Sequence, residues 1–195
     1  MIRLYEKKDA PELLAIYTHY VQETVVTFDT KVPTLTEYES KIDQIMETAP
    51  CFVCELAGRV VGYAYAAPYR DKGAYQWTKE LTVYVDGNYQ KQKIGTALYI
   101  ALVDVLKLQR YRHLVVAITL PNIPSVGFHQ RMGFLPVGVF ENVGMKFGKG
   151  YRVGWYQLAL QDMYEPAEPI LPYRPLLQQA EGQKALIRGA NRILA

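Results

Sequence analysis

The stretch Thr82-Val83-Tyr84-Val85, followed after a turn by Gln90-Lys91-Gln92-Lys93-Ile94-Gly95-Thr96-Ala97-Leu98, decides the fold. Its β-branched and aromatic first part predicts a strand, and its last part opens an amphipathic helix predicted over 94–108. Free N–H groups at the start of such a helix bind anions, and a glycine there lets a phosphate approach the backbone. Lys91 and Lys93 disfavour the helix by ~0.3–1 kcal/mol, an effect that a polyanionic ligand would reverse. The stretch therefore predicts a phosphate site, with two exposed loop lysines as the alternative.

Outward from this unit, short strands and amphipathic helices alternate along the chain. Asp9 with Glu12, and Thr36 with Glu39, have the spacing of capping boxes at the start of two helices. The remaining pattern predicts strands over 2–5, 52–56, 60–67, 77–85, 114–120, 135–143 and 151–160, with a short helix from 121 to 133. The order β-α-α-β-β-β-α-β-α-β-β predicts one α/β domain, residues 1–164, with a mixed sheet and helices on both faces.

The last part of the chain, residues 165–195, has a different character. A proline-rich linker is predicted first, and then a helix over 176–194. This helix carries a basic stripe of Lys184, Arg188 and Arg192. We expect the stripe to be a solvated face, with docking on the domain or on a second subunit as the alternatives.

The composition excludes several classes of function. With 22 Lys+Arg and 19 Asp+Glu, the net charge of +3 is too small to indicate binding to nucleic acid or to a membrane surface. No apolar run is long enough to span a bilayer, and Met1-Ile2-Arg3 opens no signal peptide, so we expect a cytoplasmic location. Cys51 and Cys54 lie in a predicted strand and point to opposite faces, which favours buried thiols over a redox pair or zinc ligands. No metal is expected.

Four fragments are similar to the GCN5-related N-acetyltransferase (GNAT) superfamily, and within it to the phosphinothricin and methionine sulfoximine/sulfone acetyltransferases. They are Pro68-Tyr69-Arg70 with residues 75–80, Thr82-Val83-Tyr84-Val85, residues 120–126 with Phe128-His129, and Gly144-Met145-Lys146-Phe147-Gly148. The resemblance runs from the first strand to about Leu160. It implies a mixed, mostly antiparallel central sheet with helices on both faces, acetyl-CoA as the acetyl donor, a small-molecule amine acceptor and a homodimer.

The resemblance also implies where CoA binds. The N–H groups of Val83 and Val85 would receive the pantetheine arm and the thioester carbonyl, and Asn122 would bind the pantetheine, cap the next helix, or do both. The family's pyrophosphate loop, Q/R-x-x-G-x-G/A, has Lys93 at its first glycine; a register shifted by two residues fits the pattern but lengthens the turn. We expect CoA to bind despite this change. The expected CoA-site residues are Val83, Tyr84, Val85, Gln90, Lys91, Gln92, Lys93, Ile94, Gly95, Thr96, Ala97, Asn122 and Ser125.

Acetylation of an amine by a thioester requires a base, donors for the oxyanion and a leaving thiolate. Glu80 stands in an apolar and aromatic strand, where desolvation would raise its pKa, and it shares a face with Thr82 and Tyr84. A solvent-facing strand residue is the alternative. The resemblance makes Glu80 the general base and places His129 where relatives carry the acid toward the CoA sulfur, although a lone histidine on a helix is more often structural.

The expected acceptor site is cationic and aromatic. Two of its cations would match a substrate that carries a carboxylate and a second polar group, with surface cations and core aromatics as the alternative. The residues expected there are Phe28, Arg70, Lys72, Tyr75, Trp77, Thr82 and Lys146. The favoured function is acetylation of an amino-acid-like α-amine. The alternatives are acetylation of a protein N-terminus, a lysine or a polyamine, and a CoA-binding module without catalysis.

Overall fold

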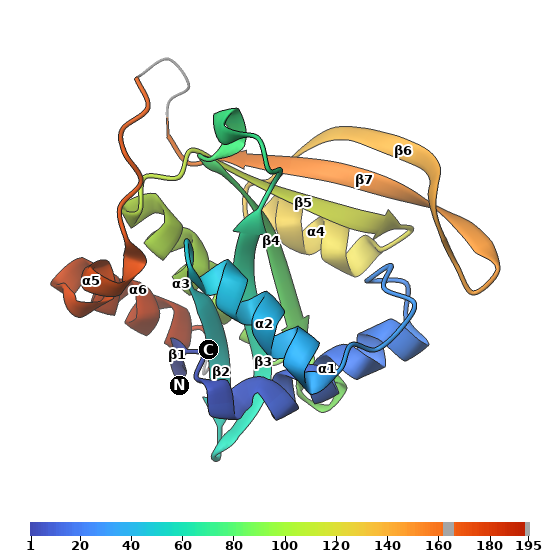
Figure 1. Cartoon of the computed structure of the whole chain (residues 1–195), viewed down its shortest axis with the longest axis horizontal. Helices are drawn as coiled ribbons and strands as arrows, with labels where there is room; N and C mark the ends of the chain where they lie inside the picture. Colours follow the sequence, from blue (N-terminus) through green and yellow to red (C-terminus); the bar gives the residue numbers. More distant parts are fainter. Residues whose placement is uncertain (162–165, 194–195) are drawn as a thin grey trace.

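The computed structural model describes residues 1–161 and 166–193 of the chain. Seven strands form one sheet of order β1-β2-β3-β4-β5-β7-β6, in which β4 and β5 are parallel and the other neighbours antiparallel. The α/β fold with a mixed, mostly antiparallel sheet is thereby confirmed (Figure 1). The strands are β1 (Ile2–Leu4), β2 (Cys51–Leu56), β3 (Arg59–Pro68), β4 (Thr78–Val85), β5 (His113–Leu120), β6 (Leu135–Lys146) and β7 (Lys149–Ala159).

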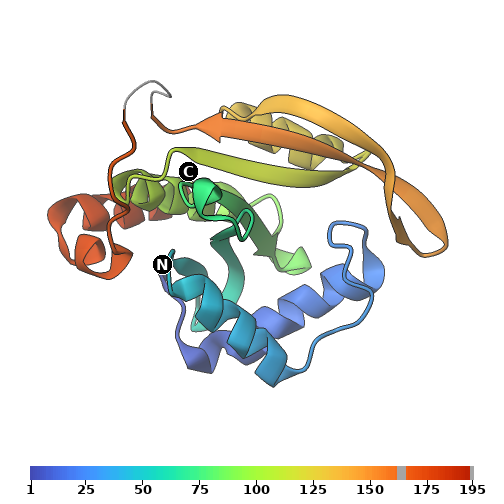
Figure 2. The ribbon, with the colours of Figure 1, turned by 45° about the horizontal axis from the view of Figure 1, so that its top comes forward.

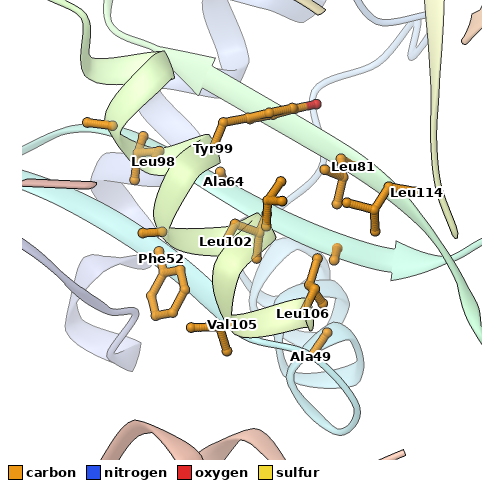
Figure 3. Packing of buried hydrophobic residues seen from close by; sticks show 14 of the residues in the cluster. Ala49, Phe52, Ala64, Leu81, Leu98, Tyr99, Leu102, Val105, Leu106 and Leu114 are labelled. Atoms are coloured by element: carbon orange, nitrogen blue, oxygen red, sulfur yellow. The ribbon is translucent and has the colours of Figure 1, made fainter. Parts of the chain in front are cut away.

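Helices cover both faces of the sheet, as the pattern predicts. The helices are α1 (Ala10–Glu23), α2 (Leu35–Met46), α3 (Ile94–Leu108), α4 (Ile123–Arg131), α5 (Tyr173–Gln178) and α6 (Ala180–Ala190). On one face, Tyr17 of α1 and Tyr38 of α2 pack against Tyr63 of β3 in a tyrosine-rich core. On the other face, α3 packs its leucines against side chains of β2 to β5 (Figure 3). No helix of residues 1–161 and 166–193 is long and apolar enough to cross a membrane.

The tail docks on the domain. Leu171 exchanges two hydrogen bonds with Gln109, and Arg188 of α6 forms an ion pair with Asp104 of α3. A Cβ on Gly189 would lie 2.6 Å from the carbonyl oxygen of Ala97, so α6 rests directly on α3. The alternative of docking on the domain is therefore what the structure shows, because α6 turns small residues toward α3. The basic stripe itself is exposed, as expected, at Lys184, Arg188 and Arg192.

The predicted tail helix is also divided in two. Gln179 has an extended backbone, with φ −84° and ψ 162°, and this ends α5 before α6 begins. The expected boundary at residues 164 and 165, and the helix end at Leu194, lie outside the described residues.

Some local signals were displaced from their expected positions. The cap of α2 is Thr34, whose hydroxyl accepts from the Glu37 N–H, instead of Thr36 with Glu39. Asp9 does not cap α1 with its side chain, because its carboxylate accepts hydrogen bonds from the Arg3 guanidinium and from the Glu6 N–H. The predicted loop over 144–150 is mostly strand, since β6 and β7 stay paired as far as Lys146 and Lys149.

Candidate active site

The site begins where β4 and β5 separate. The two strands pair only from Thr78 opposite His113 to Glu80 opposite Val115, although both continue for several residues. Figure 1 shows them diverging from this point, while β5 stays paired with β7. A cavity of about 270 Å³, here called the fork cavity, lies between the two diverging ends. Its lining comes from β4, β5, α3, α4, Val153 of β7 and the loop between α1 and α2.

The edge of β4 that faces the fork carries backbone donors. Asp86 donates its N–H to the Val61 carbonyl of β3 at 2.9 Å, so the amides of Val83 and Val85 point to the opposite edge of the strand. Beyond Glu80 no neighbouring strand pairs with that edge. The Val85 N–H has only a long contact of 3.4 Å, to the hydroxyl of Tyr20. The fork thus offers the N–H groups of Val83 and Val85 to an extended polar ligand.

Glu80 supplies a carboxyl group to the fork cavity. The side chain is half-buried, and this desolvation raises the pKa of Glu80 above its ordinary value. Thr82 and Tyr84 line the same cavity from the same face of β4, as strand alternation predicts. A carboxylate that is short of water and open to a cavity is suited to accept a proton from a bound amine.

His129 reaches the cavity together with Tyr99, a residue that the sequence pattern does not single out. His129 Nδ1 lies 2.8 Å from the Ser125 carbonyl oxygen, so Nδ1 carries the proton. Burial lowers the pKa of His129, so the neutral ring accepts at Nε2 from the Tyr99 hydroxyl, 2.8 Å away. Burial, followed by the charge of Glu80, raises the pKa of Tyr99. Figure 3 shows the Tyr99 ring along one edge of the buried cluster, with the hydroxyl at its far end.

The loop before α3 forms an open helix start. Lys93 is the N-cap, with a left-handed φ of 61°, and Lys91 has a φ of 66°. The first hydrogen bond of the helix runs from the Ala97 N–H to the Lys93 carbonyl at 2.9 Å. The three amides from Ile94 to Thr96 therefore come before the hydrogen bonds of the helix. The left-handed backbone at Lys93 is one that glycine adopts without strain, which agrees with the glycine that the family pattern implies at this position. The amides at this helix start and along β4 fit a polar arm that ends in a diphosphate.

A second cavity, of about 460 Å³, continues along the face of the sheet that carries Glu80. Thr78, two residues before Glu80 on β4, lines it, and so do Tyr75 and Trp155. The Arg70 guanidinium lies 5.1 Å from the Tyr69 ring centre and 5.6 Å from that of Tyr75. We call it the Arg70 cavity.

The structure brings together only part of the expected acceptor site. Phe28 and Thr82 line the fork cavity, whereas Arg70 and Tyr75 line the Arg70 cavity. Lys72 is exposed and lines neither cavity.

Three further predicted residues have hydrogen-bond partners within the protein. The Trp77 indole donates to the Glu168 carbonyl in the tail at 2.9 Å. The Lys146 amine donates to the Thr27 carbonyl at 2.8 Å. Asn122 caps α4 by accepting from the Ser125 N–H at 3.1 Å, as one of its two expected roles requires. Among the described residues, no group of three or more His, Cys, Asp or Glu side chains is arranged to hold a metal ion.

Comparisons with known proteins agree with this geometry. The sequence model of the acetyltransferase (GNAT) domain matches residues 2–155. The phosphinothricin N-acetyltransferase of Streptomyces viridochromogenes is 34% identical over 177 residues, which cover 91% of this chain and 94% of the relative. The L-methionine sulfoximine/L-methionine sulfone acetyltransferase of Pseudomonas aeruginosa is 31% identical over 154 residues, covering 78% of this chain and 90% of the relative.

A solved structure carries the same fold. The phosphinothricin acetyltransferase of Sinorhizobium meliloti, in complex with acetyl-CoA, superposes with a TM-score of 0.84 and 25% identity, over 89% of this chain and 96% of that one. Residues 2–155, which the GNAT domain model matches, include the fork, the helix start of α3 and Glu80. The chain belongs to the GNAT acetyltransferase family and is an acetyl-CoA-dependent N-acetyltransferase.

Proposed function

We propose that the chain transfers acetyl from acetyl-CoA to the α-amino group of a small amino-acid-like acceptor, of the phosphinothricin and methionine sulfoximine/sulfone class. One observation carries this proposal. The fork cavity and the Arg70 cavity follow each other on one face of the sheet, with Glu80 in the first and its neighbour Thr78 in the second. A donor held along β4 in the fork, and an acceptor that Arg70 holds and whose amine reaches into the fork cavity beside Phe28, would therefore meet at Glu80. The names of the relatives support the acceptor class.

The donor side of the site uses backbone groups. The N–H groups of Val83 and Val85 would hold the pantetheine arm and the thioester carbonyl, and the α3 start would hold the diphosphate. Lys91 and Lys93 would add positive charge there. Gly95 lies close to the end of β4, since a Cβ there would be in ordinary contact with Val85 at 3.8 Å, and its lack of a side chain leaves the helix start open to the diphosphate.

In the proposed chemistry, Glu80 accepts the first proton of the acceptor ammonium, and the neutral amine attacks the thioester carbonyl carbon. The carbon–nitrogen bond forms, the oxyanion meets the β4 amides, and the carbon–sulfur bond then breaks as the nitrogen loses its second proton. Tyr99 turns its hydroxyl proton from His129 Nε2 to the leaving thiolate, and the second proton released by the nitrogen passes through water to the tyrosine oxygen and replaces it. Glu80 returns the first proton to solvent. One proton thus ends on sulfur and the other returns to solvent, while both groups are restored.

The acceptor side uses one guanidinium and aromatic walls. Arg70 would bind the acceptor carboxylate in a bidentate pair. The neighbouring rings of Tyr69 and Tyr75 would help to hold the guanidinium in place. Cationic acceptors such as polyamines or lysine side chains would oppose Arg70, which disfavours that alternative activity.

A thiol-release assay with acetyl-CoA tests this function. We expect turnover with phosphinothricin and methionine sulfone, and none with spermidine or with peptides. Preferred turnover of peptides or polyamines would contradict the acceptor class. Saturable CoA binding without turnover on any acceptor would instead indicate a binding module.

We also propose that the enzyme is a homodimer joined through β6. This strand is at the edge of the sheet and is almost wholly exposed, which is unusual for so apolar a strand. Its exposed apolar side chains are Leu135, Val137, Val139, Phe140, Val143 and Met145. Light scattering would give twice the mass of 22.3 kDa for the wild type, and a charged residue at Val139 would yield the monomer.

A further inference from the structure

The loop over residues 24–33 forms one wall of the fork cavity without any regular structure of its own. Val26, Thr27 and Phe28 line the cavity, and the loop contains no helix or strand. Figure 2 shows the loop leaving α1 and extending toward the β6–β7 hairpin before it returns to α2. Its position must therefore come from contacts that side chains make with neighbouring elements.

The first set of contacts comes from α1. The hydroxyl of Tyr17, which is almost fully buried, donates to the carboxylate of Asp29 and lies 3.1 Å from the Thr27 hydroxyl oxygen. The Asp29 N–H also donates to that hydroxyl oxygen, at 3.2 Å. Asp29 and Thr27 are thus joined to each other and to the helix that precedes the loop.

The second set comes from the far end of the chain. Lys146 on β6 is only 4% exposed, and its amine donates to the Thr27 carbonyl at 2.8 Å across 119 residues of sequence. Burial lowers the pKa of Lys146, and the charge of Asp29 acts in the opposite direction and favours the ammonium. The amine therefore has a carbonyl partner and a nearby countercharge, and Lys146 lines neither cavity.

Gly144, two residues before Lys146 on β6, makes room for the loop. A Cβ on Gly144 would lie 2.0 Å from Cε2 of Phe28, so the phenyl ring rests directly on the backbone of β6. Tyr151 lies opposite Gly144 on β7, and its ring centre is 6.3 Å from the ring centre of Phe28. Any larger residue at position 144 would displace the ring that lines the cavity.

We propose that Lys146 is a positioning residue, which fastens the loop over 24–33 to β6 and so holds Phe28 against the fork cavity, and that it binds no anionic group of the acceptor. What the cavity accepts rests on the proposed function, but the fastening itself does not. Gly144 and Asp29 are the other two parts of the same device.

Three acceptors that differ in their number of anionic groups separate this role from direct binding of the acceptor. Phosphinothricin carries two anionic groups, methionine sulfone one, and the carboxamide of methionine sulfone none. We expect Lys146→Met to lower kcat/KM by roughly ten- to a hundredfold for each acceptor that the wild type turns over, with the ratios between acceptors kept within about twofold. The Kd for CoA should stay unchanged. A loss that grows with the number of anionic groups would overturn the proposal, because it would show Lys146 binding the acceptor.

Lys149→Met is the matched control, since Lys149 is exposed and directly opposite Lys146 in the hairpin. It should leave all rates within about twofold, and a loss equal to that of Lys146→Met would show an effect of hairpin charge alone and contradict the proposal. Lys146→Arg, which keeps a donor and the charge, should recover part of the activity.

Hydrogen exchange gives a readout that needs no acceptor. Amides of residues 24–33 should exchange at least about tenfold faster in Lys146→Met and in Gly144→Ala than in Lys149→Met, and the rest of the domain should keep its protection. Unchanged protection of the loop would overturn the proposal even if activity fell. If the wild type acetylated none of the acceptors, the proposed function would fail while the exchange result still decided the role of Lys146.

Discussion

The donor side and the acceptor side of the site are built in different ways. The donor side is a fork of two strands and the start of one helix, and most of what it offers is backbone: the amides of Val83 and Val85 and those that open α3. The acceptor side consists of the loop over 24–33, the Arg70 cavity and a strand from the end of the domain. Backbone groups persist when side chains change, so the donor side can stay constant in a family while the acceptor side varies.

Glu80 stands at the junction of the two sides, and its loss should have the largest effect. We predict that Glu80→Gln lowers kcat/KM about 10²- to 10⁴-fold, because no carboxylate remains to accept the ammonium proton. The Kd for CoA, measured by calorimetry, should change less than twofold. Wild-type turnover in this variant would remove Glu80 from the chemistry.

The pH dependence of kcat/KM gives a second test of Glu80. The pKa of Glu80 is raised by burial, so kcat/KM should fall as the pH drops through a value above 4.5, where the carboxylate becomes protonated. In Glu80→Gln this acid limb should disappear. Its persistence would assign the limb to another group.

The next largest effect should be confined to the acceptor side. Arg70→Ala should raise the acceptor KM by roughly ten- to a hundredfold, the loss of a charge-assisted pair worth about 1.5–3 kcal/mol. Saturation with acetyl-CoA should be unaffected. Lys72→Ala is the matched control, because Lys72 lies on the same loop but lines neither cavity, and an equal loss there would contradict a specific role for Arg70.

Substitutions of Tyr99 and His129 test which of the two side chains takes part in the reaction. Tyr99→Phe should lower kcat by about tenfold, since it removes the hydroxyl that faces the cavity and leaves His129 Nε2 without its donor. His129→Ala should lower turnover through the same pair. If Tyr99→Phe were silent while His129→Ala was slow, the histidine would act directly instead of through the tyrosine.

The smallest effect concerns backbone strain on the donor side. Lys93→Gly should raise the free energy of unfolding by up to about 1 kcal/mol, because relief of the left-handed backbone outweighs the extra flexibility of unfolded glycine. Lys93→Ala removes the same charge but keeps the strain, so chemical denaturation should show no gain. Equal stabilisation by both variants would point to charge.

The contrast between the two sides also explains what could be predicted from the sequence. The strand, turn and helix around Gly95 are contiguous, so their residue pattern was enough to predict the helix over 94–108 and the order of the elements. Glu80 could be proposed as the base because it stands in an apolar and aromatic strand and because the family resemblance places a base at this position. The sequence pattern could not decide which residue caps α2, since both Thr34 and Thr36 are followed by a glutamate three residues later.

The acceptor side depended on contacts that no local pattern contains. Lys146 lies 119 residues from the Thr27 carbonyl that it binds, and Trp77 is turned toward Glu168 in the tail. Tyr99 stood in a helix that looked like core, where only the need of a buried hydroxyl for a partner could have singled it out. Docking of the tail on the domain stayed one of two alternatives, because Gly189, which lets α6 lie on α3, gives no apolar signal.

A crystal structure with CoA and methionine sulfone bound together tests the central claim most directly. We predict that the pantetheine follows β4 in the fork, with the diphosphate at the amides before Ala97 and the acceptor nitrogen within hydrogen-bond distance of the Glu80 carboxylate. A nucleotide bound outside the fork, or an acceptor nitrogen remote from Glu80, would contradict it.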